Sequence, residues 1–212
     1  MLKKISTILL IMTWVDVLIL SAFGLLSPIF AIFVTGQIQG GTATVVGFAT
    51  AAYLISRSLV QLPVGRFIDK RSGEKDDYIV LLLGYAILTL VPFLYLIART
   101  PAHIYILQAM LGAADALAIP SYLAIFSRHL DHNHEGTEWS FRSVFTSIAA
   151  AVAGAAGGVI ADSLGFRALF IIAGCLSLLS TISIFFIKPF IYEERAKILP
   201  PGLAQVGSPK AK

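Results

Sequence analysis

The stretch GRFIDKRSG, residues 65–73, separates two long apolar runs of this 212-residue chain, Thr42–Val64 and Tyr78–Ala98. Each run holds roughly the 20 residues that a helix needs to cross a bilayer. A short basic segment between two such runs is typical of a membrane hairpin whose loop faces the cytoplasm. Because lipid offers no hydrogen bonds to the backbone, both runs are predicted to be helices.

Six apolar runs occur along the chain, and they predict an all-α membrane protein with six transmembrane helices. The composition agrees, since 57% of the residues are hydrophobic, 13% are charged and the mean hydropathy is +0.84. These values exclude a disordered chain and an ordinary soluble enzyme. Twelve helices would need about 240 residues, more than the chain has. The predicted spans are Ile8–Val34, Thr42–Val64, Tyr78–Ala98, Ala102–Ser127, Ser143–Ala161 and Phe166–Ile187.

Basic residues are divided unequally between the two sides of a six-helix arrangement. One side holds 13 of the 16 lysines and arginines, whereas Arg99 and Arg167 fall on the other side and Arg57 lies inside a helix. Basic residues accumulate on the cytoplasmic side of membrane proteins. We therefore expect a multi-pass integral protein of a prokaryotic plasma (inner) membrane, with both termini in the cytoplasm.

An internal repeat divides the six spans into two groups of three. Gly65-x-x-x-Asp69 follows the second span and Gly158-x-x-x-Asp162 ends the fifth, 93 residues later. Because the two copies fall on opposite sides of the membrane, they predict two inverted three-helix repeats, an architecture found in transporters. The predicted units are residues 1–98, residues 99–188 and a disordered cytoplasmic tail, residues 189–212.

Residues 65–73 resemble motif A of the major facilitator superfamily, which has a Gly, three residues, an Asp, a basic residue and a second Gly. The resemblance extends over all six spans and implies the N-terminal half of the family's twelve-helix fold. The second Gly comes one residue late, and Gln108 stands where proton-driven drug exporters of the family have an arginine. The motif residues are Gly65, Arg66, Asp69, Lys70, Arg71 and Gly73.

The resemblance implies that these motif residues latch the cytoplasmic side of the transporter. Gly65 has no Cβ and would let a neighbouring helix approach closely. Asp69 would accept hydrogen bonds from a helix N-terminus or pair with Arg128 or Arg142. The alternative is a basic turn that only sets the orientation of the chain in the membrane.

Three ionisable residues lie inside the predicted spans, and such residues face protein or water rather than lipid. At 1.5 Å per residue, Asp16 is about 12 Å and Arg57 about 11 Å from the cytoplasmic ends of their helices. This common depth predicts an Asp16–Arg57 ion pair, which either acts in transport or only fixes the packing. Asp115 lies about 18 Å deep with no basic residue at its level. We expect it to carry a proton, the alternative being a structural polar group.

Polar side chains form one stripe on each of two spans. Gln108, Asp115 and Tyr122 recur at seven-residue steps on the fourth span. The stripe on the second span recurs at four-residue steps and consists of Tyr53, Arg57 and Gln61. Both stripes are predicted to face a cavity, which the family resemblance places between spans one, two, four and five. The third and sixth spans carry few polar residues and are expected to face lipid.

No pairing of a nucleophile with a base, phosphate-binding loop or nucleic-acid motif is present, so the chain is predicted not to be an enzyme or to bind nucleic acid. The histidines between residues 128 and 138 fit no strong zinc pattern, and neither a metal nor a cofactor is expected. Half of a transporter fold predicts proton-coupled movement of a small organic solute across the bilayer by a homodimer. The alternatives are a subunit that needs a separate six-helix half, and an inactive fragment.

Overall fold

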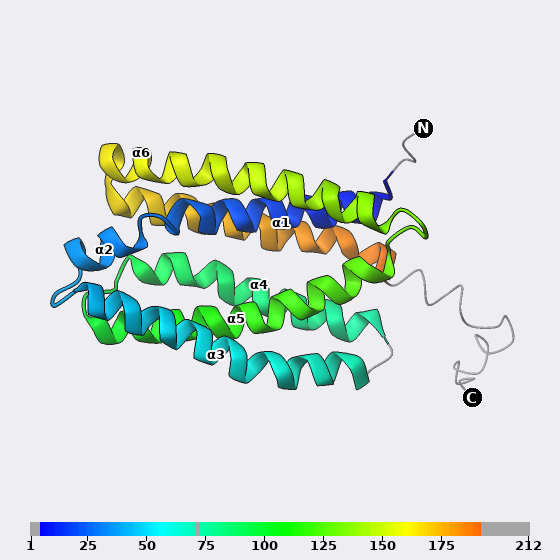
Figure 1. Ribbon diagram of the computed structural model, residues 1–212, viewed down its shortest axis with the longest axis horizontal. Coiled ribbons are helices and arrows are strands. Elements are labelled where there is room, and N and C mark those ends of the chain that lie inside the picture. The colour runs from blue at the N-terminus through cyan, green and yellow to red at the C-terminus, as the bar shows by residue number, and fades with distance from the viewer. Residues whose placement is uncertain (1–4, 71–72, 192–212) are drawn as a thin grey trace, which may run out of the picture.

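The computed structural model describes residues 5–70 and 73–191, and these residues form a bundle of long helices (Figure 1). Lys3, Lys4, Arg71 and residues 192–212 of the predicted tail lie outside the described residues. Residues 189–191, predicted to begin the disordered tail, are helical instead, because Ile191 is buried in the core. The helices are α1 (Thr7–Leu26), α2 (Phe30–Gln37), α3 (Ala43–Lys70), α4 (Glu74–Tyr95), α5 (Pro101–Arg128) and α6 (Glu135–Ile184), with the 3-10 turn η1 (Phe185–Ile187) after α6.

Two of the predicted spans differ in detail from the helices observed. The first span is broken into α1 and α2 at residues 27–29, because Pro28 has no backbone N–H to continue the helix. The second span continues as α3 through Asp69 to Lys70, although its apolar residues end at Val64. The first half of motif A is therefore the last turn and a half of a helix rather than a loop.

The fifth and sixth spans form the two arms of α6, residues 135–164 and 166–184. The helix reverses at Gly165, whose φ of 81° and ψ of 168° suit a residue without a Cβ. The two arms then run in opposite directions, and α1 contacts both of them (Figure 1). Within the described residues, five helices are long and apolar enough to cross a membrane. Because α6 reverses at Gly165, it contributes two crossings. The prediction of an all-α protein with six membrane-spanning segments is thus confirmed.

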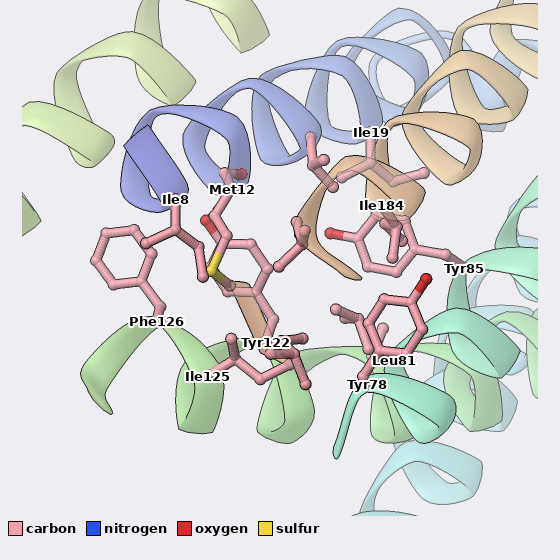
Figure 2. Close-up of a cluster of buried hydrophobic side chains, with 14 of the residues drawn as sticks. Ile8, Met12, Ile19, Tyr78, Leu81, Tyr85, Tyr122, Ile125, Phe126 and Ile184 are labelled. Carbon is pink, nitrogen blue, oxygen red and sulfur yellow. Dashed lines mark hydrogen bonds between the residues drawn. The ribbon is translucent and has the colours of Figure 1, made fainter. Parts of the chain in front are cut away.

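Helix packing divides the bundle into two groups joined by α4. The first helix, α1, lies along α6, α3 lies along α5, and α4 contacts both α5 and α6 (Figure 1). Buried side chains from α1, α4, α5 and α6 meet in a core toward the end where the described chain begins and finishes (Figure 2). The labelled core residues are Ile8, Met12, Ile19, Tyr78, Leu81, Tyr85, Tyr122, Ile125, Phe126 and Ile184.

The third span is expected to face lipid, and α4 presents exposed apolar side chains on one side only, among them Ile79, Leu83 and Leu90. Tyr78, Tyr85 and Tyr95 of α4 are buried between the neighbouring helices. Thr89 of α4 also donates to, or accepts from, the hydroxyl of Thr181 of α6 at 2.8 Å, which ties the two helices together. A helix with few charged residues can therefore still pack inside the bundle, because its tyrosine and threonine hydroxyls form hydrogen bonds with neighbouring helices.

The most exposed of the long helices is α3. Only Val45, Ala49 and Ile68 of its 28 residues are buried, since α5 covers it on one side. Large apolar side chains on its other side are exposed, among them Phe48, Ile55, Leu59 and Leu62. Such a surface requires either lipid or another helical bundle as its neighbour.

Candidate functional site

A groove of about 570 Å³ runs along the bundle and is lined by residues of all six α-helices, α1 to α6. Most of its wall is apolar, with two carboxylates and two guanidinium groups among the lining side chains. The structure brings together six of the seven side chains predicted to face a cavity: Asp16, Tyr53, Arg57, Gln108, Asp115 and Tyr122. The seventh, Gln61, is half-buried on α3 but does not line the groove.

A chain of two hydrogen bonds joins the carboxylate of α5 to the guanidinium of α3. Tyr53 donates its Oη–H to Oδ2 of Asp115 at 2.5 Å. Arg57 in turn donates from Nη1 to Oη of Tyr53 at 3.2 Å. The prediction that Asp115 has no basic group near it is therefore wrong. The depth estimate placed Arg57 by its backbone, whereas the guanidinium reaches Asp115 through the tyrosine one turn away.

The second carboxylate of the groove, Asp16, forms an ion pair with Arg142 of the first arm of α6. The predicted pair of Asp16 with Arg57 is thus wrong, because a common depth does not place two side chains on facing sides of their helices. The Asp16 side chain is 9% exposed and that of Arg142 22%, so the pair is largely buried. Nε of Arg142 also donates to Oη of Tyr122 at 3.3 Å, and the Tyr122 hydroxyl donates to the carbonyl of Met12 at 3.1 Å.

Arg142 is the functional candidate that the sequence reasoning missed. The apolar run of the fifth span begins at Ser143, so Arg142 was counted as a cytoplasmic loop charge. In the structure α6 begins at Glu135, and Arg142 lies two turns inside the helix. Its guanidinium is 5.1 Å from the ring centre of Tyr122 and 5.6 Å from that of Trp139, within the range of cation–π attraction. The aromatic residues around it are the signal that would have indicated a buried position.

Close helix contacts hold these groups in place. A Cβ on Gly112 of α5 would overlap the carbonyl oxygen of Tyr53, so α3 approaches α5 at this level only because residue 112 is glycine. The same contact includes a hydrogen bond of 2.7 Å from the Ser56 hydroxyl to the carbonyl of Ala109. On the other side of the bundle, a Cβ on Gly157 of α6 would overlap the carbonyl oxygen of Leu25.

Motif A lies away from the groove, at the end of α3. Arg66, Asp69, Lys70 and Gly73 are exposed, and Gly73 precedes the first turn of α4. The close helix approach expected at Gly65 does not occur within this bundle, since no atom of another helix among the described residues lies within 4 Å of the position of a Cβ there.

The two arginines proposed as partners of Asp69 are engaged with other carboxylates. Arg128 pairs with Asp77, in the first turn of α4, and Arg142 pairs with Asp16. The expected pairing of Asp69 with either of them within the bundle is therefore wrong. Asp77 competes better for Arg128 because its side chain is fully buried and needs a counter-charge more than an exposed carboxylate does.

Six membrane-spanning segments around a groove with paired charges define the class of protein: a multi-pass membrane protein of transporter architecture. The chain belongs to the Major Facilitator Superfamily, whose family model matches residues 10–209. This is a family of membrane transporters rather than of enzymes, and the resemblance of residues 65–73 to motif A is explained by this membership.

Curated relatives of the chain carry the name multidrug resistance protein MdtG. The protein of Dickeya zeae is 26% identical over 162 residues, which cover 75% of this chain and 38% of that protein. Those of Escherichia fergusonii and Escherichia coli O9:H4 are both 25% identical over 164 and 165 residues, and each match covers 76% of this chain and 39% of the relative. The chain thus spans about two fifths of the length of these relatives.

Proposed function

We propose that this six-helix bundle forms one wall of the pathway of a secondary transporter that moves a small organic solute across the membrane. The observation that carries the proposal is the groove, in which four charged side chains from α1, α3, α5 and α6 are paired within an apolar wall. Charged groups inside a membrane bundle mark solute or ion pathways. The name of the MdtG relatives, multidrug resistance protein, favours an amphipathic organic solute.

The pathway needs a second bundle to cover the groove, because alternating access is a movement of two bundles about a shared site. A second copy of this chain is the simplest source, and a separate six-helix half is the alternative. The exposed apolar side of α3 and the open space beside Gly65 are suited to such a neighbour. In this arrangement Asp69 latches onto the second bundle, since Arg128 and Arg142 are engaged elsewhere.

The inverted repeat is part of the same proposal, and the helix contacts support it. The repeat relates the first span to the fourth and the second to the fifth. The contact of the first span with the fifth then corresponds to the contact of the fourth with the second, although the glycine of close approach is Gly157 of the fifth span in one pair and Gly112 of the fourth in the other. Both termini are proposed to lie in the cytoplasm, and the described chain begins and finishes at one end of the bundle (Figure 1).

Proton coupling is assigned to Asp115 rather than to Asp16. Asp16 is bound directly by the guanidinium of Arg142, whereas the hydroxyl of Tyr53 stands between Asp115 and Arg57. A carboxylate in a direct, largely buried ion pair loses that pair when it is protonated. Protonation of Asp115 breaks no direct ion pair and weakens only the hydrogen bond through which Tyr53 and Arg57 stabilise the ionised form, so a proton binds there at lower cost.

The experiment uses the protein in proteoliposomes, with ethidium as the probe and an imposed pH gradient as the driving force. We expect the parent protein to move ethidium against its gradient. Asp115→Asn, which retains shape and cannot titrate, should abolish driven movement while ethidium exchange without a gradient and the melting temperature are retained. Driven movement by Asp115→Asn would exclude Asp115 as the proton site, and its absence from the parent would contradict the proposed function for ethidium-like solutes.

A further inference from the structure

Tyr53 is the middle residue of the hydrogen-bond chain from Arg57 to Asp115, and its role in proton binding differs from that of the Asp115 carboxylate. We propose that Tyr53 is a positioning residue for the proton site: it joins Arg57 to Asp115 and so sets the pH at which Asp115 takes up a proton. This inference rests on the proposed function, in which Asp115 carries the proton, and it names what controls that site.

The direction of the two hydrogen bonds carries the argument. A tyrosine hydroxyl has one proton, and Tyr53 gives it to Oδ2 of Asp115 at 2.5 Å. A lone pair of the same oxygen accepts from Nη1 of Arg57 at 3.2 Å. Each donor thus points to the next acceptor, and the chain ends on the carboxylate. A donor bound to a cation is a stronger donor, so Tyr53 transmits the charge of Arg57 to Asp115 and stabilises its ionised form.

The helices that carry the chain are held at a fixed separation. Tyr53 and Arg57 are one turn apart on α3, and Asp115 lies nearly one turn beyond Gly112 on α5. Gly112 meets the carbonyl of Tyr53, and Ser56 donates to the carbonyl of Ala109 at 2.7 Å. When the charge of Asp115 changes, its side-chain partners therefore adjust, while the spacing between α3 and α5 stays the same.

Asp16 lacks this arrangement. The tyrosine beside it, Tyr122, donates its proton to the carbonyl of Met12, and the carboxylate meets Arg142 directly. Asp115 is thus distinguished from Asp16 by a hydroxyl placed between carboxylate and guanidinium. The remaining titratable or charged groups lining the groove, none of which the substitutions below alter, are Asp16, Tyr85, Tyr95, Tyr122 and Arg142.

The test titrates Asp115 in the purified protein in nanodiscs by infrared difference spectroscopy of its protonated carboxyl band, which Asp115→Asn assigns. Tyr53→Phe should move the midpoint toward higher pH by about one unit, a tenfold gain in proton affinity, because the ionised form loses its donor. Arg57→Gln should move the midpoint in the same direction in the parent, and clearly less in the Tyr53→Phe background. This lack of additivity is what a relay through Tyr53 requires.

Two control variants distinguish an effect of the Arg57–Tyr53–Asp115 hydrogen bonds from an effect of disturbed packing between α3 and α5. Ser56→Ala breaks the other hydrogen bond of the same helix contact, and Tyr105→Phe removes a hydroxyl from α5 outside the groove. Both should leave the midpoint unchanged. An unmoved midpoint in Tyr53→Phe, additive shifts in the double variant, or an equal shift in Ser56→Ala would each overturn the inference. Because this titration needs no solute, the ethidium assay on the parent tests the proposed function separately.

Discussion

Paired charges are the main feature of this protein at the scale of single residues. Each groove carboxylate has an arginine and a tyrosine near it, yet the bonds are ordered differently, with a direct ion pair at Asp16 and an intervening hydroxyl at Asp115. The direct pair joins α1 to the first arm of α6 and is largely buried. The direct Asp16–Arg142 pair is suited to holding helices together, and this difference is why we propose Asp115 as the residue that binds the proton.

Removal of one partner of the direct pair should destabilise the bundle. Asp16→Ala leaves Arg142 without its counter-charge in a largely buried place, which we expect to cost about 3 kcal/mol. Arg142→Gln in the Asp16→Ala background should recover part of this loss, because no unpaired charge then remains. Thermal unfolding in one detergent measures both effects, and equal stability of parent and Asp16→Ala would show that the pair does not hold α1.

At the scale of elements, contacts through glycine determine how closely the helices approach. The chain has 17 glycines, and Gly112 and Gly157 lie against the backbone of a neighbouring helix, whereas Gly65 faces open space. Gly65 of motif A therefore makes no close helix contact within this bundle, whereas Ile68 of the same motif is buried.

The contrast between Gly112 and Gly65 gives a matched pair of substitutions on adjacent helices. Gly112→Ala places a methyl group against the carbonyl of Tyr53, so α3 must move and stability should fall by about 1–3 kcal/mol. Gly65→Ala should not lower the stability of the isolated bundle, since no neighbouring helix lies near the added methyl group and alanine favours the helix. Denaturation of both variants beside the parent provides the comparison. A smaller loss for Gly112→Ala than for Gly65→Ala would contradict the observed α3–α5 contact.

Six helices were predictable because length and hydropathy decide whether a segment crosses a bilayer. The groove was predictable in part, since polar stripes at helical spacing indicate which face of a helix avoids lipid. The pairing was not predictable, because depth along a helix says nothing of rotation about its axis. This is why the sequence pairs Arg57 with Asp16. Arg142 is placed in a loop for a different reason: the apolar run begins one residue later, at Ser143, whereas α6 begins at Glu135.

At the scale of the whole molecule, an even number of crossings places both ends of the described chain together (Figure 1). The distribution of basic residues predicts that this end faces the cytoplasm. Reporter fusions after Lys212 and within residues 36–41 should therefore score on opposite sides of the membrane, with the C-terminal fusion inside. Two fusions that score on the same side would contradict six crossings, and a reversed result would contradict the orientation.

Exposure of the groove to both sides of the membrane tests the central claim, that this bundle is one wall of a transport pathway. Leu111 lines the groove, and Cys175 is the one cysteine of the chain. Leu111→Cys in a Cys175→Ser background is labelled in membrane vesicles of either orientation with a membrane-impermeant maleimide. The account predicts labelling from each side, in proportions that change with pH. Labelling from one side alone at every pH would contradict it.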